Sequence, residues 1–266
     1  MSKIENAIFI EDCKKTMRRM MKHGVKCDIV LTSPPYNTSR SKGKPNALVD
    51  WTNRYDVCFD YRTEREYLDW VNGLFDDFDK ILVENGVILW NVSYGGDTTQ
   101  NTSGLGAMFL SIAEIMTHTN FTVADRITWK KKSAMPNVCS PNKLTRIVED
   151  IYVFVRKNEI KTFHANKKVV SQRENGQKMY ENIYNFIEAK NNDGANKLNK
   201  ATFSTELVTK LLCLYARPDS LIYDPFMGTG TTAVSAFTNG HRYIGSEISQ
   251  AQVMFSQERI ANTLNI

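Results

Sequence analysis

Short apolar runs alternate along this chain with longer stretches of helical periodicity, and this alternation constrains the fold more than any other feature of the sequence. Five runs are rich in β-branched and aromatic residues and have the length of buried strands: 27–32, 86–92, 147–155, 220–224 and 242–245. Five other stretches repeat apolar residues at i, i+3 and i+4, which predicts helices over 13–23, 64–83, 105–118, 205–217 and 231–239. Buried strands separated by helices are typical of a parallel sheet that is covered on both faces. We therefore predict an α/β fold whose ligands bind where the parallel strands end.

The composition excludes several other classes of protein. Of 266 residues, 42% are apolar and only 14 are Gly and 7 Pro, so neither a disordered nor a collagen-like chain is expected. No apolar run reaches the roughly 18 residues that a membrane helix needs. The first residues have acidic side chains within their apolar stretch and no small-residue cleavage site, so we expect no signal peptide. The five cysteines are scattered without a CxxC pair, which indicates reduced cytoplasmic thiols and no metal site.

Positive charge is concentrated in one part of the chain. Residues 126–200 contain 16 basic and 7 acidic side chains, a net charge of +9, whereas the rest of the chain has a net charge of −4. Such a segment predicts a surface that faces a polyanion, and the alternative is a solvated lysine-rich face. Residues 38–54 and 157–200 lack clean periodicity. We predict that both are loops or an irregular lobe placed on the sheet.

The expected strand at 220–224 ends in an acid and is followed by a glycine turn and a helix. Its sequence from Leu221 to Ala233 is Leu-Ile-Tyr-Asp-Pro-Phe-Met-Gly-Thr-Gly-Thr-Thr-Ala. Glycines allow close backbone approach to a ligand, and a helix N-terminus presents free N–H groups. The GxGxxA spacing also fits a weak nicotinamide fingerprint. However, Asp224 suits an ammonium group better than a pyrophosphate, and Glu247 follows the next strand, where an acid can bind both ribose hydroxyls. An amino-acid-bearing nucleoside therefore fits better than NAD.

A second cluster of candidate functional residues follows the expected strand at 27–32. Two prolines, Pro34 and Pro35, fix the backbone and remove two N–H donors, so carbonyl acceptors remain between Ser33 and Tyr36. This array suits an exocyclic amine that is held while its lone pair attacks, with the Tyr36 ring stacked on the base. The alternative is a tight turn with a buried tyrosine. The functional hypothesis requires both strand ends to meet, although they lie far apart in the sequence.

Together the two motifs resemble those of DNA amino-methyltransferases. Residues 33–36 are similar to the catalytic Asp/Asn/Ser-Pro-Pro-Tyr/Phe tetrapeptide, and residues 224–232 are similar to the methionine-binding motif for S-adenosylmethionine. The catalytic motif comes first, which is the circular order of the β class. The resemblance implies a Rossmann-like fold with one catalytic domain over residues 1–156 and 200–266, and an irregular basic target-recognition region over 157–199. It also implies methyl transfer to adenine N6 or cytosine N4 of a base flipped out of double-stranded DNA.

The resemblance further implies which residues bind each partner. Asp12 is expected to contact the cofactor adenine, Asp224 its methionine ammonium group and Glu247 its ribose. The other expected cofactor-binding residues are Cys13, Ser33, Phe203, Ser204, Pro225, Phe226, Gly228, Gly230 and Thr231. Residues 200–207 lack the prolines and the histidine that the family usually has there, although Ser204 still predicts a helix N-cap. DNA contacts are expected from Lys130, Lys131, Lys132, Lys143, Arg146, Lys167, Lys168 and Arg173.

Several alternatives stay open at the level of the sequence. Serine at position 33 is associated more often with cytosine, whereas adenine methylation is commoner overall. An RNA or protein-glutamine amino-methyltransferase shares the tetrapeptide but normally has the cofactor motif first, and a non-catalytic nucleic-acid-binding module would have lost one motif. Residues 191–194 are a turn or a base-reading tip, and residues 38–54 are a flap that orders on DNA or an inert loop. A homodimer and a companion restriction endonuclease are compatible with the class.

Overall fold

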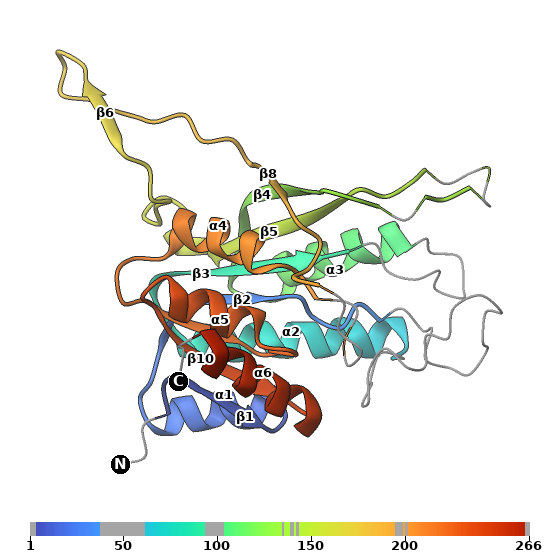
Figure 1. The fold of residues 1–266 in the computed structure, drawn as a ribbon. Coiled ribbons are helices and arrows are strands. Elements are labelled where there is room, and N and C mark those ends of the chain that lie inside the picture. Colours follow the sequence, from blue (N-terminus) through green and yellow to red (C-terminus); the bar gives the residue numbers. More distant parts are fainter. Residues whose placement is uncertain are drawn as a thin grey trace.

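One mixed sheet forms the centre of the molecule. The computed structural model describes residues 4–37, 62–93, 104–134, 136–138, 141, 144–194, 199 and 202–263, and of residues 104–107 only the backbone. Within these residues, eight strands lie in the order β1-β10-β9-β2-β3-β5-β4-β8 (Figure 1). In that order their bounds are Ala7–Ile10, Arg242–Glu247, Leu221–Asp224, Cys27–Thr32, Leu82–Val92, Val148–Arg156, Phe121–Lys131 and Phe186–Ala189. Neighbouring strands are parallel except around β5, which is antiparallel to β3 and β4.

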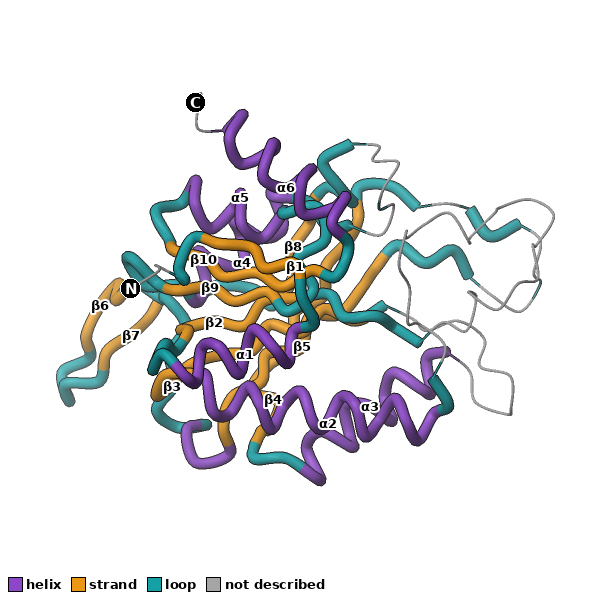
Figure 2. The backbone as a smooth tube through the Cα atoms, turned by 90° about the horizontal axis from the view of Figure 1, so that it is seen from below, coloured by secondary structure: helices purple, strands orange, loops and turns teal. Residues whose placement is uncertain are grey.

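Among the described residues, three helices cover each face of the sheet, which confirms the predicted α/β architecture. One face packs against α1 (Cys13–Lys22), α2 (Glu64–Ile81) and α3 (Gly104–His118). The other packs against α4 (Thr205–Tyr215), α5 (Thr231–Thr238) and α6 (Gln250–Thr263). Figure 2 shows α5 and α6 on one side of the sheet and α1, α2 and α3 on the other. Burial on both faces explains why the parallel strands read as continuous apolar runs in the sequence.

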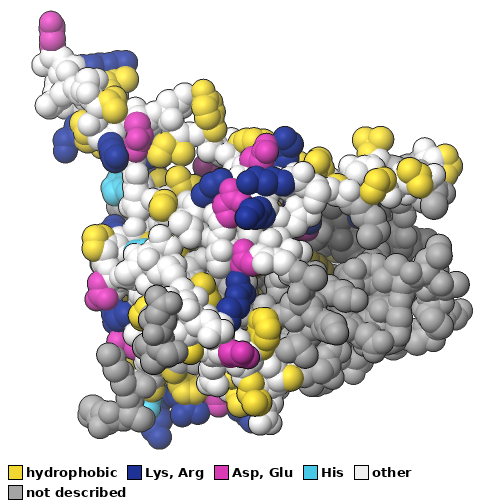
Figure 3. Space-filling model, viewed as in Figure 1, with side chains coloured by type: hydrophobic (Ala, Val, Ile, Leu, Met, Phe, Trp, Pro, Cys, Tyr) yellow, Lys and Arg dark blue, Asp and Glu magenta, His cyan; other side chains and the backbone are white. Residues whose placement is uncertain are grey.

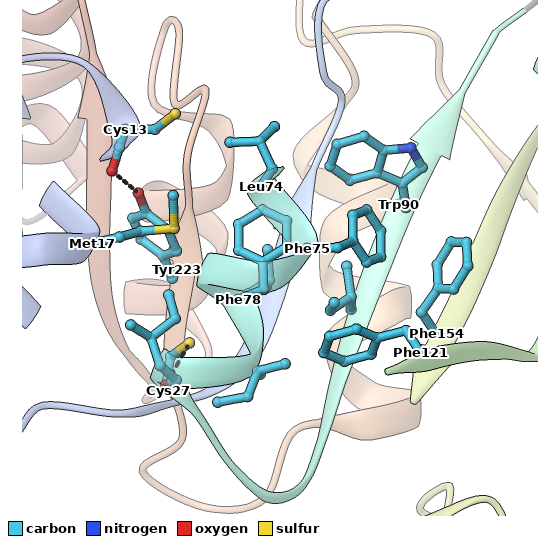
Figure 4. Close-up of a cluster of buried hydrophobic side chains, with 14 of the residues drawn as sticks. Cys13, Met17, Cys27, Leu74, Phe75, Phe78, Trp90, Phe121, Phe154 and Tyr223 are labelled. Carbon is cyan, nitrogen blue, oxygen red and sulfur yellow. Dashed lines mark hydrogen bonds between the residues drawn. The ribbon is translucent and has the colours of Figure 1, made fainter. Parts of the chain in front are cut away.

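An aromatic cluster fills the space between α2 and the sheet (Figure 4). The Phe75 ring lies 5.0–5.6 Å from four other rings, all in edge-to-face geometry. Those rings belong to Phe78, Trp90, Phe121 and Phe154. Edge-to-face pairs contribute about 0.5–1.5 kcal/mol each beyond the burial of their area. The cluster therefore fixes α2 on the sheet, and α2 in turn contacts the site described below.

Side-chain caps define the starts of α1, α2 and α4. Asp12 accepts the Lys14 N–H before α1, and Ser204 accepts the Leu207 N–H before α4, as the sequence predicts for Ser204. Thr63 and Glu66 form a capping box at the start of α2. Each cap satisfies N–H groups that the helix cannot pair internally. All five predicted helices are present, with bounds within two residues of the prediction.

The structure corrects the expectation that residues 157–200 are irregular. This stretch holds a 3₁₀ turn at Lys157–Glu159, an antiparallel hairpin of β6 (Val169–Gln172) and β7 (Lys178–Tyr180), and the sheet strand β8. The hairpin projects away from the body of the molecule (Figure 1). The segment therefore combines an arm with a strand that returns to the main sheet.

None of the helices in the described part of the chain is long and apolar enough to cross a membrane.

Candidate active site

The two motifs that follow β2 and β9 lie side by side at one edge of the sheet. The two strands are parallel neighbours, with Val30 opposite Tyr223, so both end at the same edge. A hydrogen bond joins the strand ends directly, because Thr32 Oγ1 donates to Asp224 Oδ1 at 2.7 Å. The structure therefore brings together the motifs that the functional hypothesis required to meet.

Asp224 is the most deeply buried acid of the site. It is 2% exposed, and besides Thr32 it accepts the Thr232 hydroxyl on Oδ2 at 2.6 Å and the Phe226 backbone N–H on Oδ1 at 3.0 Å. Burial raises the pKa of Asp224 from 3.8 to about 6, although the two threonine hydroxyls oppose this shift. Among the described residues, Oδ2 takes one of these bonds and Oδ1 takes two. A carboxylate oxygen accepts two bonds, so Oδ2 can accept a further donor.

The glycine turn after Asp224 has the backbone that its sequence predicts. Gly228 and Gly230 have φ values of +54° and +83°, in the region that side chains disfavour. The Gly228 N–H donates to Glu247 Oε2 at 2.9 Å, so the acid at the end of β10 contacts the turn. Gly230 is the N-cap of α5, and Thr231 accepts a bond from Arg259 at 3.0 Å. The turn is therefore held by β10 and α6 as well as by its own bond from the Gly230 N–H to the Met227 carbonyl at 3.0 Å.

Gly230→Ala tests how strongly this turn depends on glycine. A Cβ at position 230 would lie 2.5 Å from the Ser256 Cβ, and the backbone would still require a positive φ. We expect the free energy of unfolding to fall by about 3 kcal/mol, the sum of left-handed strain and steric overlap. Gly240→Ala is the matched control, since φ is +74° there and nothing lies within 4 Å. It should cost only about 1 kcal/mol. Urea unfolding of both variants measures the difference, and equal losses would contradict the proposed close approach to Ser256.

The Ser-Pro-Pro-Tyr turn after β2 is fixed by contacts with α2 and β3. The Tyr67 hydroxyl on α2 donates to the Pro35 carbonyl at 3.0 Å. The Ser33 and Tyr36 hydroxyls form a short hydrogen bond with each other. Asn91 on β3 donates from Nδ2 to the Tyr36 hydroxyl at 3.2 Å and to Ser33 Oγ at 3.5 Å. The turn is thus a connected polar network and not an isolated loop.

Aromatic contacts connect α2 to the glycine turn. Trp70 stacks obliquely on Phe226 and on Tyr67, with ring centroids 5.7 Å apart in both pairs. The Arg62 guanidinium lies 4.5 Å from the centroid of the Trp70 ring. Through Tyr67, which bonds to Pro35, and Trp70, which packs on Phe226, α2 therefore touches both motifs.

The remaining predicted cofactor-binding residues occupy the surrounding elements. Asp12 caps α1, and Cys13 is buried beside it; its carbonyl accepts the Tyr223 hydroxyl at 3.2 Å (Figure 4). Burial raises the pKa of the Cys13 thiol to about 12, so this thiol stays protonated. Phe203 is 9% exposed, and Ser204 is the cap of α4. Pro225 lies between Asp224 and Phe226 at the start of the turn.

Four polar residues beside the two motifs were not predicted from the sequence. Asn199 donates to Gln252 at 3.0 Å, and a Cβ on Gly228 would lie 3.2 Å from the former and 3.4 Å from the latter. Asn91 and Glu149 are bonded to each other at 3.2 Å next to Ser33. These residues come from four separate parts of the chain, and no local motif marks them. The alternation of β3 does place Asn91 on the same face as Leu89.

The basic residues predicted to contact DNA are divided between two ends of the molecule. Three lysines lie at or just after the end of β4, and each forms an ion pair. The pairs are Lys130 with Glu188, Lys131 with Glu149, and Lys132 with Glu206. Arg146 lies just before β5, and Lys143 lies outside the described residues. Lys130, Lys131, Lys132 and Arg146 flank the edge at which β2 and β9 end, because β5 begins where β4 ends and β5 is antiparallel to β3.

The structure does not bring Lys167, Lys168 and Arg173 to this edge. Arg156, the last residue of β5, donates to the carbonyls of Leu82 and Val83, where β3 begins. Strand β5 therefore ends at the edge opposite the site, and the chain continues from there into the β6–β7 hairpin (Figure 1). The three cations belong to the hairpin or its approach, within the segment 157–199 predicted to recognise the target, and they lie apart from Lys130, Lys131, Lys132 and Arg146.

Two loops had alternative interpretations. Asp193 accepts bonds from the Thr205 N–H and the Thr205 hydroxyl and forms an ion pair with Arg259, while Asn191 donates to the Ser133 carbonyl. Residues 191–194 therefore connect β8 with α4 and α6, which favours a structural turn over a base-reading tip. The candidate flap at 38–54 lies outside the described residues.

Comparisons with known proteins bear on the family and the fold of this chain. Residues 27–258 match the family described as DNA methylase. The orphan methyltransferase M.BamHII of Bacillus amyloliquefaciens is 25% identical over 264 residues, which cover 88% of this chain and 89% of that protein. The M1.HpyAVI–SAM complex has a TM-score of 0.60 at 18% identity, over 95% of this chain and 98% of its own. PvuII DNA methyltransferase, described as cytosine-N4-specific, has a TM-score of 0.63 at 16% identity, over 97% and 91%. The two structures share the fold of this chain.

Proposed function

This chain belongs to the DNA methylase family, and from that membership we propose the reaction that its site performs. It transfers a methyl group from S-adenosylmethionine to an exocyclic amine, adenine N6 or cytosine N4, of a base flipped out of double-stranded DNA. The observation that carries this proposal is the adjacency of β2 and β9. Because of it, the turn that suits an amine lies beside the turn that suits an amino-acid-bearing nucleoside.

The residues around the glycine turn fit this cofactor. Gly228 and Gly230 allow the left-handed backbone of the turn between Asp224 and α5, and Asp224 Oδ2 can accept an ammonium donor. When bound, S-adenosylmethionine supplies an electrophilic methyl group on a sulfonium. We assign Asp224 to its ammonium group, Glu247 to its ribose and Asp12 to its adenine. Residues that would complete the site are Cys13, Ser33, Phe203, Ser204, Pro225, Phe226, Gly228, Gly230 and Thr231.

The turn after β2 would hold and orient the target amine. An aromatic amine is a weak nucleophile because its lone pair is delocalised into the ring. Hydrogen bonds from the amine to Ser33 Oγ and to the Pro34 carbonyl would localise that lone pair and fix its direction. The neighbouring Pro35 carbonyl already accepts the Tyr67 hydroxyl, which leaves the Pro34 carbonyl as the proposed acceptor. Orientation of this kind can lower the barrier by about 7–11 kcal/mol, so no strong base is needed before attack.

Tyr36 would supply the stacking surface for the flipped base. Removing a base from the duplex costs a few kcal/mol, and stacking on an aromatic ring offsets about 1–3 kcal/mol of that cost. In this structure the Tyr36 hydroxyl is bonded to Ser33 and Asn91, so the ring is held next to the amine acceptors. The same contacts would keep the base aligned with them.

We propose that DNA lies against the edge at which β2 and β9 end. The connection from β4 to β5 extends from this edge, and its Val138 and Leu144 are 85% and 88% exposed. Lys132 and Arg146 lie on the same connection, and Lys130 precedes it. Figure 3 shows basic and acidic side chains interleaved over α4 and β8, in agreement with the ion pairs of these two lysines. Phosphate binding there would require exchange of those pairs.

Three further assignments rest on the proposed reaction alone. A protein that modifies chromosomal DNA would act in the cytoplasm of a prokaryotic cell. A homodimer and a companion restriction endonuclease remain predictions of the class. Sedimentation of the purified protein with and without a DNA duplex would measure the oligomeric state.

Expression in a methylation-free host tests the proposed function. Single-molecule sequencing of the host DNA should reveal one modified amine, either adenine N6 or cytosine N4, in a single sequence context. The matched control is Ser33→Ala, which should remove every mark while the protein still binds S-adenosylmethionine. If S-adenosylmethionine with a labelled methyl group transfers the label to RNA or protein instead of DNA, DNA is not the substrate. Cofactor binding without any methylated product would indicate a non-catalytic module.

A further inference from the structure

Four polar side chains cross the sheet on one face, at the edge where the site lies. They are Ser33 after β2, Asn91 on β3, Glu149 on β5 and Lys131 on β4, and we call them the polar row. Strand residues two positions apart share a face. The residues two positions from the members of the polar row all belong to one core cluster: Leu31, Leu89, Ile151 and Trp129. Because β2, β3, β5 and β4 are successive in the sheet, the four polar side chains follow one another across it.

The polar row is continuous through direct contacts. Lys131 forms an ion pair with Glu149, whose other oxygen accepts Asn91 Nδ2 at 3.2 Å. The same nitrogen lies 3.2 Å from the Tyr36 hydroxyl and 3.5 Å from Ser33 Oγ. Asn91 is 5% exposed and the Glu149 side chain 10%, so water screens these contacts weakly.

The chemistry of Glu149 determines how Asn91 is oriented. A carboxylate only accepts hydrogen bonds, so it selects the amide nitrogen of Asn91 and turns Oδ1 away. The second N–H of Asn91 is then directed at the Ser33 and Tyr36 hydroxyls. Within the described residues, Oδ1 has no donor although it is buried. An amide whose sole purpose was packing would be expected to pair both ends.

We propose that Asn91, Glu149 and Lys131 are positioning residues that set the direction of hydrogen bonding at Ser33. The inference rests on the proposed amine methylation. Asn91 donates into one lone pair of Ser33 Oγ, and in this assignment the Ser33 hydroxyl hydrogen is directed at the Tyr36 hydroxyl. The other lone pair of Ser33 Oγ is then left for an N–H of the target amine. Lys131 compensates the buried charge of Glu149 and so belongs to this network rather than to the phosphate-binding surface.

A purely structural ion pair would not explain the connection to Ser33. A buried pair is weak evidence for stability by itself, because the cost of desolvation can exceed the Coulombic gain. A second pair between the same two strands, Arg126 with Asp150 at 3.8 Å, provides a comparison. In the described part of the chain, neither Arg126 nor Asp150 forms a hydrogen bond with the turn at residues 33–36. Arg126→Met is therefore the matched control.

The test separates kcat from KM, using tritiated S-adenosylmethionine and unmethylated genomic DNA. Asn91→Asp cannot donate to Ser33 and should lower kcat about 100-fold, as expected for a misplaced reacting group. Glu149→Gln and Lys131→Met should each lower kcat about 10-fold, and Lys131→Arg should restore it to within about threefold. The KM for DNA and the cofactor Kd should stay within about threefold in all variants. Arg126→Met should keep kcat within about twofold.

Each alternative result contradicts a specific part of the inference. If Lys131→Met raises the KM for DNA and leaves kcat unchanged, Lys131 binds phosphate and is not a positioning residue. If Asn91→Asp keeps the kcat of the wild type, the network has no role at Ser33. Cofactor binding measured by calorimetry reports whether each variant is folded. If Asn91→Asp does not fold, the kcat of Glu149→Gln tests the inference instead. A wild-type protein that methylates no DNA would refute the proposed function, whereas equal kcat values in an active series would refute only this inference.

Discussion

Replacing Tyr36 by alanine is expected to lower methyl transfer to DNA about 1000-fold while the affinity for S-adenosylmethionine stays within about twofold. Loss of base stacking accounts for about 1–3 kcal/mol, and misplacement of the amine by about 1 Å for roughly another 100-fold. Tyr36 provides both contributions, because its ring offers the stacking surface and its hydroxyl contacts Ser33 and Asn91. Single-turnover transfer of tritiated methyl groups to unmethylated DNA measures the first quantity, and calorimetry measures the second.

Tyr36→Phe is the matched control for this experiment. It retains the ring but removes the hydroxyl, so we expect a loss of only about 10-fold, close to the value of one hydrogen bond. A loss as large as that of Tyr36→Ala would mean that the hydroxyl, and not the ring, carries the function. Full turnover by Tyr36→Ala would show that the amine does not bind at residues 33–36.

The fold could be predicted from the sequence wherever secondary structure has a local periodic signal. The helices α1 to α5 each have an apolar stripe, and β2 and β9 read as continuous apolar runs. Helix α6 was missed because two of its buried positions are polar, Gln252 and Ser256. Ser256 is small because Gly230 lies close to the Ser256 Cβ, a contact that is visible only in three dimensions. Strand β4 was missed because Asp125 and Arg126 interrupt its apolar pattern on the exposed side.

The site could be predicted only where its residues are consecutive in the sequence. Residues 33–36 and 224–230 form local motifs whose backbone chemistry is readable from proline and glycine. Asn91 and Glu149 meet because β5 inserts between β3 and β4 in an antiparallel sense. Strand order of this kind depends on long-range packing, which a single sequence does not reveal. Tyr67 reaches Pro35 from α2 for the same reason.

The net charge of a sequence segment likewise could not predict where its charged side chains lie in the fold. The excess of cations between residues 126 and 200 predicted one polyanion-facing surface. In the structure, Lys130 and Lys132 pair with Glu188 and Glu206, and the latter lies outside the counted segment. The direction of β5 then carries the β6–β7 hairpin to the opposite edge. The net charge of a sequence segment does not specify at which end of a sheet its charged side chains lie.

Asp224→Asn is expected to weaken S-adenosylmethionine binding about 100-fold, because a hydrogen-bonded charge pair with the ammonium group contributes up to about 3 kcal/mol. The fold should tolerate the change. An amide oxygen at the Oδ1 position still accepts the Thr32 hydroxyl and the Phe226 N–H, while the Thr232 hydroxyl can rotate and accept from the new amide nitrogen at the Oδ2 position. Asp219→Asn is the matched control, since Asp219 precedes the same strand at its other end and pairs with Arg242. Its cofactor affinity should equal that of the wild type.

The pH dependence distinguishes a binding role of Asp224 from a structural one. Burial raises the pKa of Asp224 to about 6 in the folded protein from 3.8, so the folded state binds more protons than the unfolded state between these values. The free energy of unfolding should therefore decrease by about 3 kcal/mol as the pH rises from about 4 to about 6, and Asp224→Asn should remove this slope. An ammonium ligand prefers the ionised carboxylate, so wild-type cofactor affinity should increase as the pH rises through 6, and that of the variant should not. If the stability slope disappears in the variant but cofactor affinity is unchanged at every pH, Asp224 only anchors the glycine turn, and the ammonium group binds elsewhere.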